Sequence, residues 1–297
     1  MKNKTIAVMG GGSWGTVLAN LAALNGSNVI LWMRDLAVIE QVNTTHSNKK
    51  YLPEYKLSEK VKATNALKEI SLADTVIFCV PSDSFREIVQ SASGHIKDSA
   101  HLISATKGVE ENGFSLMSNV IEEVLGSQRS IGVLSGPNLA GEIALNQITG
   151  TVIASKDKHL QNQFIEDYSS DSFRVYISDD PYGVEMGGAL KNIYAIACGI
   201  ADGLNSGENT IGMIMTRGLA EMSRLAIVMG ANPQTFLGLS GVGDLITTCA
   251  SPMSRNHKMG KYLGQGLTVN QAKIRIGQTT EGLKTLKVVW KKARTAG

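Results

Sequence analysis

The sequence predicts an α/β domain followed by an all-α domain, and two observations carry that prediction. In the first half of the 297-residue chain, short apolar runs alternate with stretches of helical periodicity, which is typical of a parallel sheet covered by helices on both faces. Beyond DDPYGVEM (179–186) the apolar spacing is mostly helical and no convincing strand remains. We therefore place the domain boundary near Pro181, with the α/β domain over 1–182 and the helical domain over 183–297.

The α/β half begins with a strand, a helix and a second strand. These are predicted at TIAVMG (5–10), SWGTVLANLAALNG (13–26) and NVILWMR (28–34), and Gly26 closes the helix. Helical stretches such as SDSFREIVQSAS (82–93) separate several of the later strands. Those strands are predicted, from their short apolar runs, at 74–80, 100–106, 130–136 and 149–155.

Composition and charge exclude several classes of protein. The net charge of +3 is too small to indicate nucleic-acid binding, which needs a clustered basic face. The first apolar run, Ile6 to Met9, is too short for a signal peptide, and no apolar stretch approaches the length that spans a bilayer. Cys79, Cys198 and Cys249 lie far apart, as reduced thiols do in a cytosolic protein, and no His/Cys cluster has metal-ligand spacing. We expect a cytoplasmic protein without membrane insertion, nucleic acid or metal.

A glycine-rich loop follows the first predicted strand and opens the first predicted helix. GGGSWG (10–15) holds the spacing Gly10-x-Gly12-x-x-Gly15. Gly10 permits a tight turn, Gly12 lets the backbone approach a pyrophosphate, and Gly15 lets helix and strand pack closely. The helix N-terminus offers free N–H groups to the phosphates. An ordinary glycine-rich turn is the alternative, but the strand–turn–helix context favours a Rossmann-type dinucleotide site.

The end of the second predicted strand bears on which dinucleotide binds. Such sites place an acidic residue there for a free ribose 2′-OH, or an arginine for a 2′-phosphate. The sequence LWMRD (31–35) places Arg34 at the strand end and Asp35 one residue later. A solvated Arg–Asp pair is the alternative. We expect a preference for NADP(H), with NAD(H) use kept open by Asp35.

Three further loops leave apolar strands at their carboxyl ends, where open α/β sheets bind ligands. VPSDSF (80–85) is expected along the cofactor, and LSGPNLAGE (134–142) supplies a Gly-Pro turn and a helix start. SATKG (104–108) brings Lys107 to the same edge. Lysines are mostly surface residues, but the position of Lys107 between a buried strand and Gly108 favours a site role.

A second candidate site lies in the helical half, in LSGVGDLITTCASPMSRNHKMG (239–260). Asp244 follows a flexible Gly-Val-Gly. Ser254 is a good N-cap for a helix that begins at Arg255, with Asn256 in its first turn. A helix N-terminus that carries an arginine is a strong seat for a phosphate group. A capped surface helix with a solvated arginine is the alternative.

Lys191 lies within a predicted helix, GVEMGGALKNIYAIACGIADG (183–203), that also holds two adjacent interior glycines. Each interior glycine costs roughly 1 kcal/mol relative to alanine, so the pair suggests that something flat, such as a cofactor, approaches the helix. A lysine among apolar neighbours loses hydration, which favours its neutral form and proton transfer near neutral pH. A lysine that snorkels to water is the alternative. On a helical period its face holds Val184, Gly187, Gly188, Tyr194, Ala195 and Cys198.

Taken together, these segments resemble the bacterial NAD(P)-dependent glycerol-3-phosphate dehydrogenase family. The resemblance rests on GVEMGGALKNIYAIACGIADGL, SATKG, LSGPNLA, GLSGVGDLITTC and SPMSRN, in the family's order and spacing. It implies reversible reduction of dihydroxyacetone phosphate to sn-glycerol 3-phosphate, the backbone precursor of phospholipids, and a homodimer. By motif it assigns cofactor contacts to Ser13, Trp14, Arg34, Lys107, Ala140, Arg255 and Glu281. It assigns the proton-transfer residue to Lys191 and the substrate contacts to Lys107, Gly136, Lys191, Asp244, Ser254, Arg255 and Asn256.

Two other functions stay open at this point. One is a dehydrogenase of the same architecture that acts on another hydroxy acid or sugar acid, and the other is a non-catalytic NADP-binding sensor. The phosphate seat at Arg255 argues against a substrate without a phosphate, such as another hydroxy acid or sugar acid. The presence of Lys191 argues against a non-catalytic sensor. Family members continue for several helical turns beyond the segment that resembles EGLKTLKVVWKKA (281–293), whereas this chain ends at RTAG. We therefore expect a helical domain shorter than the family's.

Overall fold

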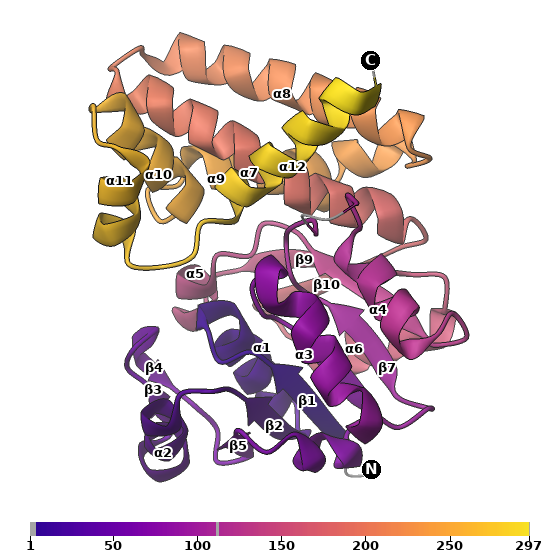
Figure 1. Cartoon of the computed structure of the whole chain (residues 1–297). Coiled ribbons are helices and arrows are strands. Elements are labelled where there is room, and N and C mark those ends of the chain that lie inside the picture. The colour runs from indigo at the N-terminus through magenta and orange to yellow at the C-terminus, as the bar shows by residue number, and fades with distance from the viewer. Residues whose placement is uncertain (1–3, 111–112, 297) are drawn as a thin grey trace.

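A computed structural model describes residues 4–110 and 113–296, and it shows a sheet-based half below a helical half (Figure 1). The strands are β1 (Thr5–Met9), β2 (Asn28–Trp32), β3 (Ser47–Asn48), β4 (Leu52–Lys56), β5 (Val61–Thr64), β6 (Thr75–Phe78), β7 (His101–Ser104), β8 (Ile131–Ser135), β9 (Thr149–Ser155) and β10 (Phe173–Ser178). The α-helices of the sheet-based half are α1 (Ser13–Leu24), α2 (Leu36–Thr45), α3 (Phe85–Ala92), α4 (Met117–Leu125), α5 (Ala140–Ala144) and α6 (Lys158–Tyr168). Those of the helical half are α7 (Pro181–Gly203), α8 (Glu208–Val228), α9 (Asp244–Ala250), α10 (Arg255–Gly264), α11 (Val269–Ile276) and α12 (Glu281–Ala296).

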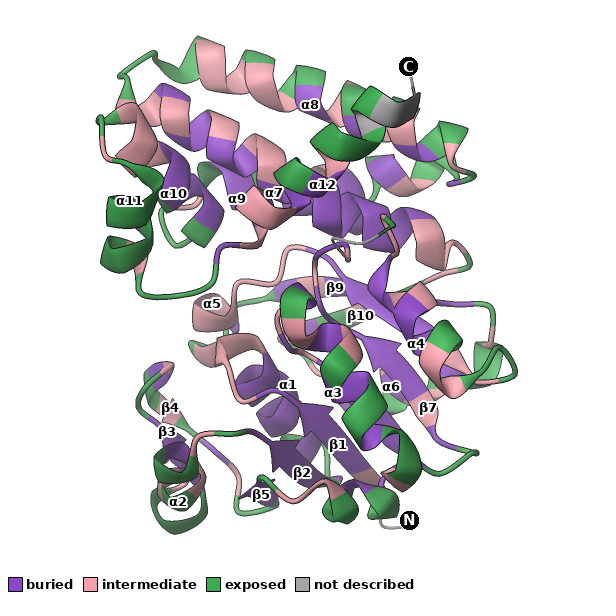
Figure 2. Cartoon of the chain, in the orientation of Figure 1, coloured by how far each residue is buried: buried purple, intermediate pink, exposed green. Residues whose placement is uncertain are grey.

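The sheet has the strand order β10-β9-β8-β7-β6-β1-β2-β5, as a Rossmann-type domain requires around β1. Alternate residues of each strand enter different cores. Ile6 and Val8 pack with α1, α2 and α6 on one face, while Ala7 and Met9 pack with α3 and α4 on the other. Helices therefore cover both faces, and Figure 2 shows the strands as a buried layer. The predicted architecture is confirmed.

One pairing departs from the predicted parallel sheet. β8 and β9 run antiparallel, with Gly132 opposite Ser155, whereas every other strand pair of this sheet is parallel. The connection between β8 and β9 holds only the five-residue α5 and stays at the carboxyl end of β8. Because the chain does not cross back to the amino end before it re-enters the sheet, the returning strand is antiparallel.

The sequence prediction also missed four short or marginal strands. β3 and β4 form a separate hairpin, and β5 and β10 are the two edge strands of the sheet. Edge strands are only partly buried, so β10 mixes apolar residues with exposed Arg174 and lacks a continuous apolar run. Their pairing is decided by neighbours far away in the sequence.

The long helix α7 joins the two halves. Val184 in its first turns packs on Val133, Val152 and Ala154 of the sheet. Further along, Ala195 and Cys198 belong to the core of the helical half. The division of the chain at residues 182 and 183 stays a prediction.

Close glycine contacts fix the crossing of α7 and α10. A β-carbon at Gly199 would lie 2.1 Å from the His257 carbonyl oxygen, and one at Gly260 would lie 2.0 Å from the Ile196 carbonyl oxygen. These backbones touch because glycines are present on both helices. The contact places the N-terminus of α10 beside the segment of α7 that carries Lys191.

We expect Gly260→Ala to destabilise the protein by about 2 kcal/mol or more, because the new methyl group overlaps backbone that cannot move alone. Gly212 is the matched control. It lies inside α8, and a β-carbon there meets open space. Gly212→Ala should therefore leave stability unchanged or raise it by up to about 1 kcal/mol. Urea unfolding of both variants tests this, and equal stabilities would contradict the proposed helix contact.

Candidate functional site

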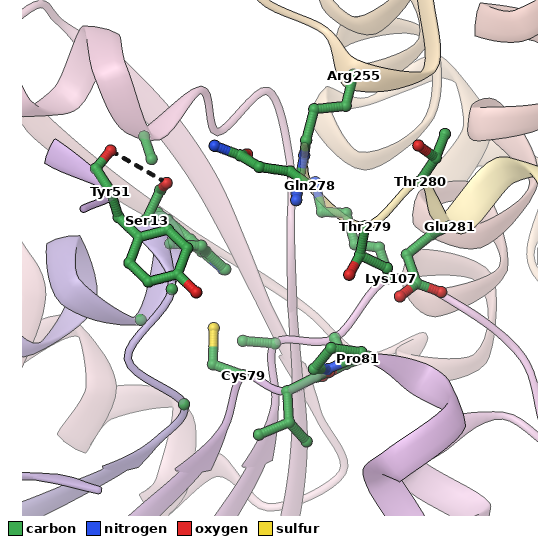
Figure 3. Close-up of a pocket in the computed structure, with 18 of the residues that line it drawn as sticks. Ser13, Tyr51, Cys79, Pro81, Lys107, Arg255, Gln278, Thr279, Thr280 and Glu281 are labelled. Carbon is green, nitrogen blue, oxygen red and sulfur yellow. Dashed lines mark hydrogen bonds between the residues drawn. The ribbon is translucent and has the colours of Figure 1, made fainter. Parts of the chain in front are cut away.

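A cavity of about 1240 Å³ lies between the carboxyl edge of the sheet and the helical half (Figure 3). The cavity is lined by the glycine-rich loop, by the loops after β6, β7 and β8, and by the start of α10 and α12. Ligands of open α/β sheets bind at this edge. Of the residues singled out in the sequence, its wall includes Gly10, Gly12, Ser13, Trp14, Gly15, Arg34, Lys107, Ala140, Lys191, Ser254, Arg255, Asn256 and Glu281.

The glycine-rich loop has the geometry of a dinucleotide cradle. Gly10 has φ +128°, in the region that favours glycine, and a β-carbon at Gly15 would lie 1.9 Å from the Gly10 carbonyl oxygen. A β-carbon at Gly12 would meet no atom within 4 Å, so this position faces open cavity. No side chain caps the N-terminus of α1 at Gly12. The free N–H groups of that helix therefore point to a place where a pyrophosphate fits.

Arg34 and Asp35 both line the cavity at the carboxyl end of β2, as the sequence predicts. Arg34 is exposed there. Asp35 is the N-cap of α2, and its carboxylate accepts a hydrogen bond from the Val38 amide at 3.3 Å. The same carboxylate pairs with Lys50 Nζ at 2.7 Å. The alternative of an Arg34–Asp35 pair is therefore replaced by a Lys50–Asp35 pair.

Lys191 lies in a buried polar cluster. Its side chain is 6% exposed, and its Nζ donates to Asp244 Oδ1 and, at 2.7 Å, to Thr248 Oγ1. Asp244 begins α9, and Thr248 lies one turn later on the same face of that helix. Lys191 is also part of the cavity wall. The ammonium group is thus held by the protein at the edge of the cavity, so it does not snorkel to bulk water.

Lys107 joins the same cluster from the sheet-based half. Its Nζ lies 2.6 Å from Asp244 Oδ2 and 2.8 Å from the carbonyl oxygen of Gly136. Asp244 is 1% exposed, so one buried carboxylate bridges two lysines from different halves of the chain. Gly136 contributes its carbonyl oxygen to this network, and its φ of +142° explains the glycine at this turn.

The electrostatic surroundings lower the pKa of Lys191. Burial is the main cause, because it removes water from the charged form. Asp244 opposes the shift by attracting the ammonium group, and Lys107 adds to it by repulsion. A lysine with a lowered pKa exchanges its proton closer to neutral pH than an ordinary lysine does, as general acid–base chemistry requires.

The adjacent glycines of α7 have a different purpose from the one expected. A β-carbon at Gly187 would lie 2.6 Å from the Ser240 carbonyl oxygen, and one at Gly188 would lie 2.5 Å from Ser135 Oγ. The space beside them is thus filled by the protein itself, and the expectation that a cofactor lies there is wrong. Ser240 belongs to a short π-helical turn, Leu239–Gly243, that directly precedes Asp244. Because Gly187 has no side chain, this turn packs against α7, and Asp244 lies next to α7 as well. The glycines let Asp244 reach Lys191.

The N-terminus of α10 matches the predicted phosphate seat in its geometry. Ser254 is the N-cap, and its Oγ accepts a hydrogen bond from the His257 amide at 3.2 Å. The first intrahelical hydrogen bond of α10 is donated by the Lys258 amide to the Ser254 carbonyl oxygen, so the earlier amides of Arg255 and Asn256 lack a helical partner. The exposed Arg255 side chain extends into the cavity between Ser13 and Glu281 (Figure 3). The start of α10 therefore offers a charged side chain and two free amides at the wall of the cavity.

The side chain of Asn256 is occupied by the protein. Its Nδ2 donates to Asn192 Oδ1 at 2.8 Å, and its Oδ1 accepts from the Gly282 amide at 3.0 Å. These bonds tie α10 to α7 and to the start of α12. Asn256 therefore holds the seat in place, and its backbone amide is the group that it can offer to a ligand.

The remaining candidates border the nucleotide end of the cavity. Ser13 Oγ donates to the Tyr51 carbonyl oxygen at 3.5 Å, and Trp14 and Ala140 pack against the core under the glycine-rich loop. Glu281 begins α12, and its carboxylate accepts from the Ser82 amide at 3.3 Å and from Ser82 Oγ at 2.5 Å. Glu281 thereby binds the helical half to the loop after β6.

Sequence reasoning missed Thr248, Asn192 and Lys50. Thr248 lies four residues after Asp244 and Asn192 directly follows Lys191, so helical spacing and sequence position were available signals for these two. Lys50 had no such signal, because its partner Asp35 lies 15 residues away, on the other side of α2 and β3.

In the part of the chain that the structure describes, no group of three or more His, Cys, Asp and Glu side chains has the arrangement of a metal site. Over those same residues, no helix is both long and apolar enough to cross a membrane.

Comparisons with known proteins point to one family. The model of the NAD-dependent glycerol-3-phosphate dehydrogenase N-terminus matches residues 5–161, and that of the C-terminus matches residues 180–297. A glycerol-3-phosphate dehydrogenase [NAD(P)+] from Teredinibacter turnerae is 49% identical over 98% of this chain and 86% of that protein. One from Acinetobacter baylyi is 51% identical over 95% of this chain and 78% of that protein. The crystal structure of glycerol-3-phosphate dehydrogenase from Coxiella burnetii matches with a TM-score of 0.95 at 38% identity, over 99% of this chain and 90% of that one.

The Lys191–Asp244–Lys107 cluster generates a prediction about stability. Asp244→Asn leaves two poorly solvated ammonium groups without their counter-charge, so we expect a loss of about 3 kcal/mol near pH 6.5. Burial lowers the pKa of Lys191 only in the folded chain. At pH values between that lowered pKa and the ordinary lysine pKa, the unfolded chain binds more protons than the folded chain does. The free energy of unfolding of the wild type therefore rises with pH in this range. Once Lys191 is neutral it needs no counter-charge, and the loss should therefore be smaller near pH 9.

Urea unfolding of wild type and Asp244→Asn at the two pH values measures this difference. Asp179→Asn serves as the control, because Asp179 pairs with Lys158 where both side chains are more than half exposed. It should change stability little at either pH. A loss in Asp244→Asn that is equal at both pH values would contradict the electrostatic account.

Proposed function

This chain belongs to the NAD-dependent glycerol-3-phosphate dehydrogenase family, and from that membership we propose that Lys191 transfers the proton in its reaction. The reaction is the reversible NAD(P)H-dependent reduction of dihydroxyacetone phosphate to sn-glycerol 3-phosphate. The observation that carries the proposal is the position of Lys191, a buried lysine with a lowered pKa in the wall of the cavity that the glycine-rich loop also lines.

The protein's own residues handle the charge that develops during reduction. The nicotinamide cofactor, when bound, supplies the hydride for the ketone carbon. Negative charge then grows on the ketone oxygen, and the Lys191 ammonium stabilises it and donates its proton. In the oxidative direction the neutral amine of Lys191 accepts the proton from the substrate hydroxyl.

Asp244 and Lys107 position the proton donor. Asp244 accepts from Lys191 through Oδ1 and from Lys107 through Oδ2, so the direction of the Lys191 side chain depends on both. Thr248 Oγ1 is the second acceptor of the Lys191 ammonium, at 2.7 Å. A donor held by two acceptors, Asp244 and Thr248, keeps its direction between turnovers, which reduces the entropy lost on reaching the reactive geometry. Lys107 also adds positive charge next to the place of the substrate oxygen.

The substrate phosphate binds at the start of α10. The Arg255 guanidinium offers a charge-assisted fork, and the amides of Arg255 and Asn256 offer two further donors. Ser254 holds this helix end in shape by capping it. This seat explains why the reaction uses a phosphorylated triose.

Both NADP(H) and NAD(H) serve as cofactors in the family. The free N–H groups after Gly10, Gly12 and Gly15 receive the pyrophosphate. Arg34 lines the cavity at the carboxyl end of β2, where an arginine would pair with a ribose 2′-phosphate, and from this we infer a preference for NADP(H). Ser13, Trp14, Lys107, Ala140, Arg255 and Glu281 border the rest of the nucleotide.

The resemblance to the family supports three further proposals. The protein forms a homodimer, it acts in the cytoplasm, and its product supplies glycerophospholipid synthesis. Mass measurement in solution tests the first. The direct test of the reaction is NADPH oxidation with dihydroxyacetone phosphate, with unphosphorylated dihydroxyacetone as the control. Equal rates with the two ketones would contradict a phosphorylated substrate.

Lys191→Met should lower kcat by at least about a hundredfold, the low end for lost acid–base catalysis. NADPH affinity should change little, because Lys191 acts at the substrate oxygen. Steady-state kinetics and NADPH titration measure the two effects. Lys258→Met, at an exposed position on α10, is the control and should retain wild-type turnover. Turnover near wild type in Lys191→Met would exclude this lysine as the proton donor.

Arg255→Ala should raise the KM for dihydroxyacetone phosphate by about tenfold or more, since it removes a charge-assisted contact. The same change should lower kcat/KM for dihydroxyacetone much less, because that ketone has no phosphate and loses only the contact of Arg255 with the nucleotide. The comparison of kcat/KM for both ketones in both proteins separates phosphate binding from damage to the fold. If both substrates lose efficiency to the same extent, the phosphate does not bind at Arg255.

A further inference from the structure

Two residues of opposite charge lie where a dinucleotide site distinguishes its cofactors. Arg34 and Asp35 follow β2 directly, and both line the cavity. An arginine there favours a ribose 2′-phosphate, whereas a carboxylate repels that phosphate and favours a free 2′-OH. Taken alone, the two side chains oppose each other.

The structure shows that the Asp35 carboxylate is already occupied on both oxygens. Oδ1 accepts from the Val38 amide at 3.3 Å, and Oδ2 accepts from Lys50 Nζ at 2.7 Å. The hydrogen bond from Lys50 is also the main reason why the pKa of Asp35 is lowered. Asp35 therefore stays ionised, with the Lys50 ammonium as a counter-charge in direct contact with its Oδ2.

Lys50 reaches Asp35 because the β3–β4 hairpin is anchored to the glycine-rich loop. Lys50 lies in the turn of this hairpin, where the Tyr51 amide donates to the Asn48 carbonyl oxygen at 3.1 Å. Asn48 is fully buried, and its Nδ2 donates to the Gly11 carbonyl oxygen at 3.0 Å and to Thr16 Oγ1 at 2.8 Å. These bonds keep the turn near the end of β2, where Figure 1 shows the hairpin close to α1 and α2. The Lys50–Asp35 contact thus depends on a buried attachment.

We propose that Lys50 determines cofactor specificity by neutralising Asp35, which leaves Arg34 as the effective charge at the ribose 2′ position. The proposal rests on the proposed function only in requiring that the cavity binds a nicotinamide dinucleotide. Without Lys50, the Asp35 carboxylate is free to repel a 2′-phosphate and to accept from a 2′-OH. Lys50 is therefore a positioning residue that acts through Asp35.

The first experiment measures binding, independently of turnover. Calorimetric titration of the full chain at low salt, where exposed charges are least screened, gives Kd for NADPH and NADH. The same titration with adenosine 2′,5′-bisphosphate and 5′-AMP isolates the 2′-phosphate. We expect Lys50→Gln to lower the ratio of the NADH Kd to the NADPH Kd by about three- to tenfold. This is the size of effect for an exposed charge pair when Asp35 loses its counter-charge beside a 2′-phosphate.

Lys49→Gln is the matched control. Lys49 is the preceding exposed lysine of the same turn, so its replacement changes the net charge equally. It should leave the preference unchanged. An equal fall in both variants would show a general effect of charge and overturn the proposal. A wild-type protein that binds neither dinucleotide would refute the proposed function instead.

A double-mutant comparison tests the route through Asp35. Asp35→Asn keeps a good N-cap for α2 and removes the charge. If Lys50 acts by neutralising Asp35, Lys50→Gln has no further effect on the Kd ratio in the Asp35→Asn background. If Lys50→Gln lowers the ratio equally in both backgrounds, Lys50 contacts the phosphate itself and the proposal is wrong.

Discussion

Asp244 is the carboxylate on which the rest of the site depends. It is almost fully buried, and it accepts from Lys191 of the helical half and from Lys107 of the sheet-based half. A buried ion pair costs desolvation that only good geometry repays. Here the geometry extends across the two halves of the chain, so the same contacts that satisfy Asp244 also hold the two walls of the cavity together. Stability and the proposed proton transfer share one set of atoms.

The helical half is built to bring that carboxylate into position. Gly187 lets the turn before α9 touch α7, and Gly260 with Gly199 lets α10 cross α7 in backbone contact. Both approaches use glycines inside helices, where each costs roughly 1 kcal/mol of helix stability. What the protein gains is a fixed distance between Lys191 and the N-terminus of α10. In the proposed reaction, the ketone and the phosphate of a triose phosphate contact these two places, so the fixed distance has to match this small substrate.

The nucleotide half follows a different principle. Its glycine-rich loop leaves space and free N–H groups, and we propose that the specificity comes from side chains on other segments. Arg34 lies at the end of β2, and Glu281 of the helical half accepts a hydrogen bond from Ser82 of the sheet-based half. Lys50 lies in the turn of the β3–β4 hairpin, which Asn48 attaches to the glycine-rich loop. The cradle is therefore general for dinucleotides, and the charges around it adapt it to a particular one.

Much of this protein was determined by its sequence alone. The strand–turn–helix start, the glycine spacing, the capped start of α10 and the buried setting of Lys191 are local patterns, and each depends on residues within a few turns of one another. Local backbone preference and periodicity are readable without tertiary contacts. The Rossmann-type domain, the helical domain and the position of the proton-transfer candidate followed from such patterns.

Tertiary structure decided the rest, because those features depend on partners distant in the sequence. The antiparallel return of β9, the edge strands, the occupied side chain of Asn256 and the protein-filled space beside Gly187 and Gly188 all follow from such contacts. The same holds for the role of Asp35. Its sequence position indicates a ribose-binding carboxylate, but the Lys50 contact changes its charge environment. A residue's type and local position indicate which chemistry it can do, and the atoms that surround it in space determine which chemistry it does.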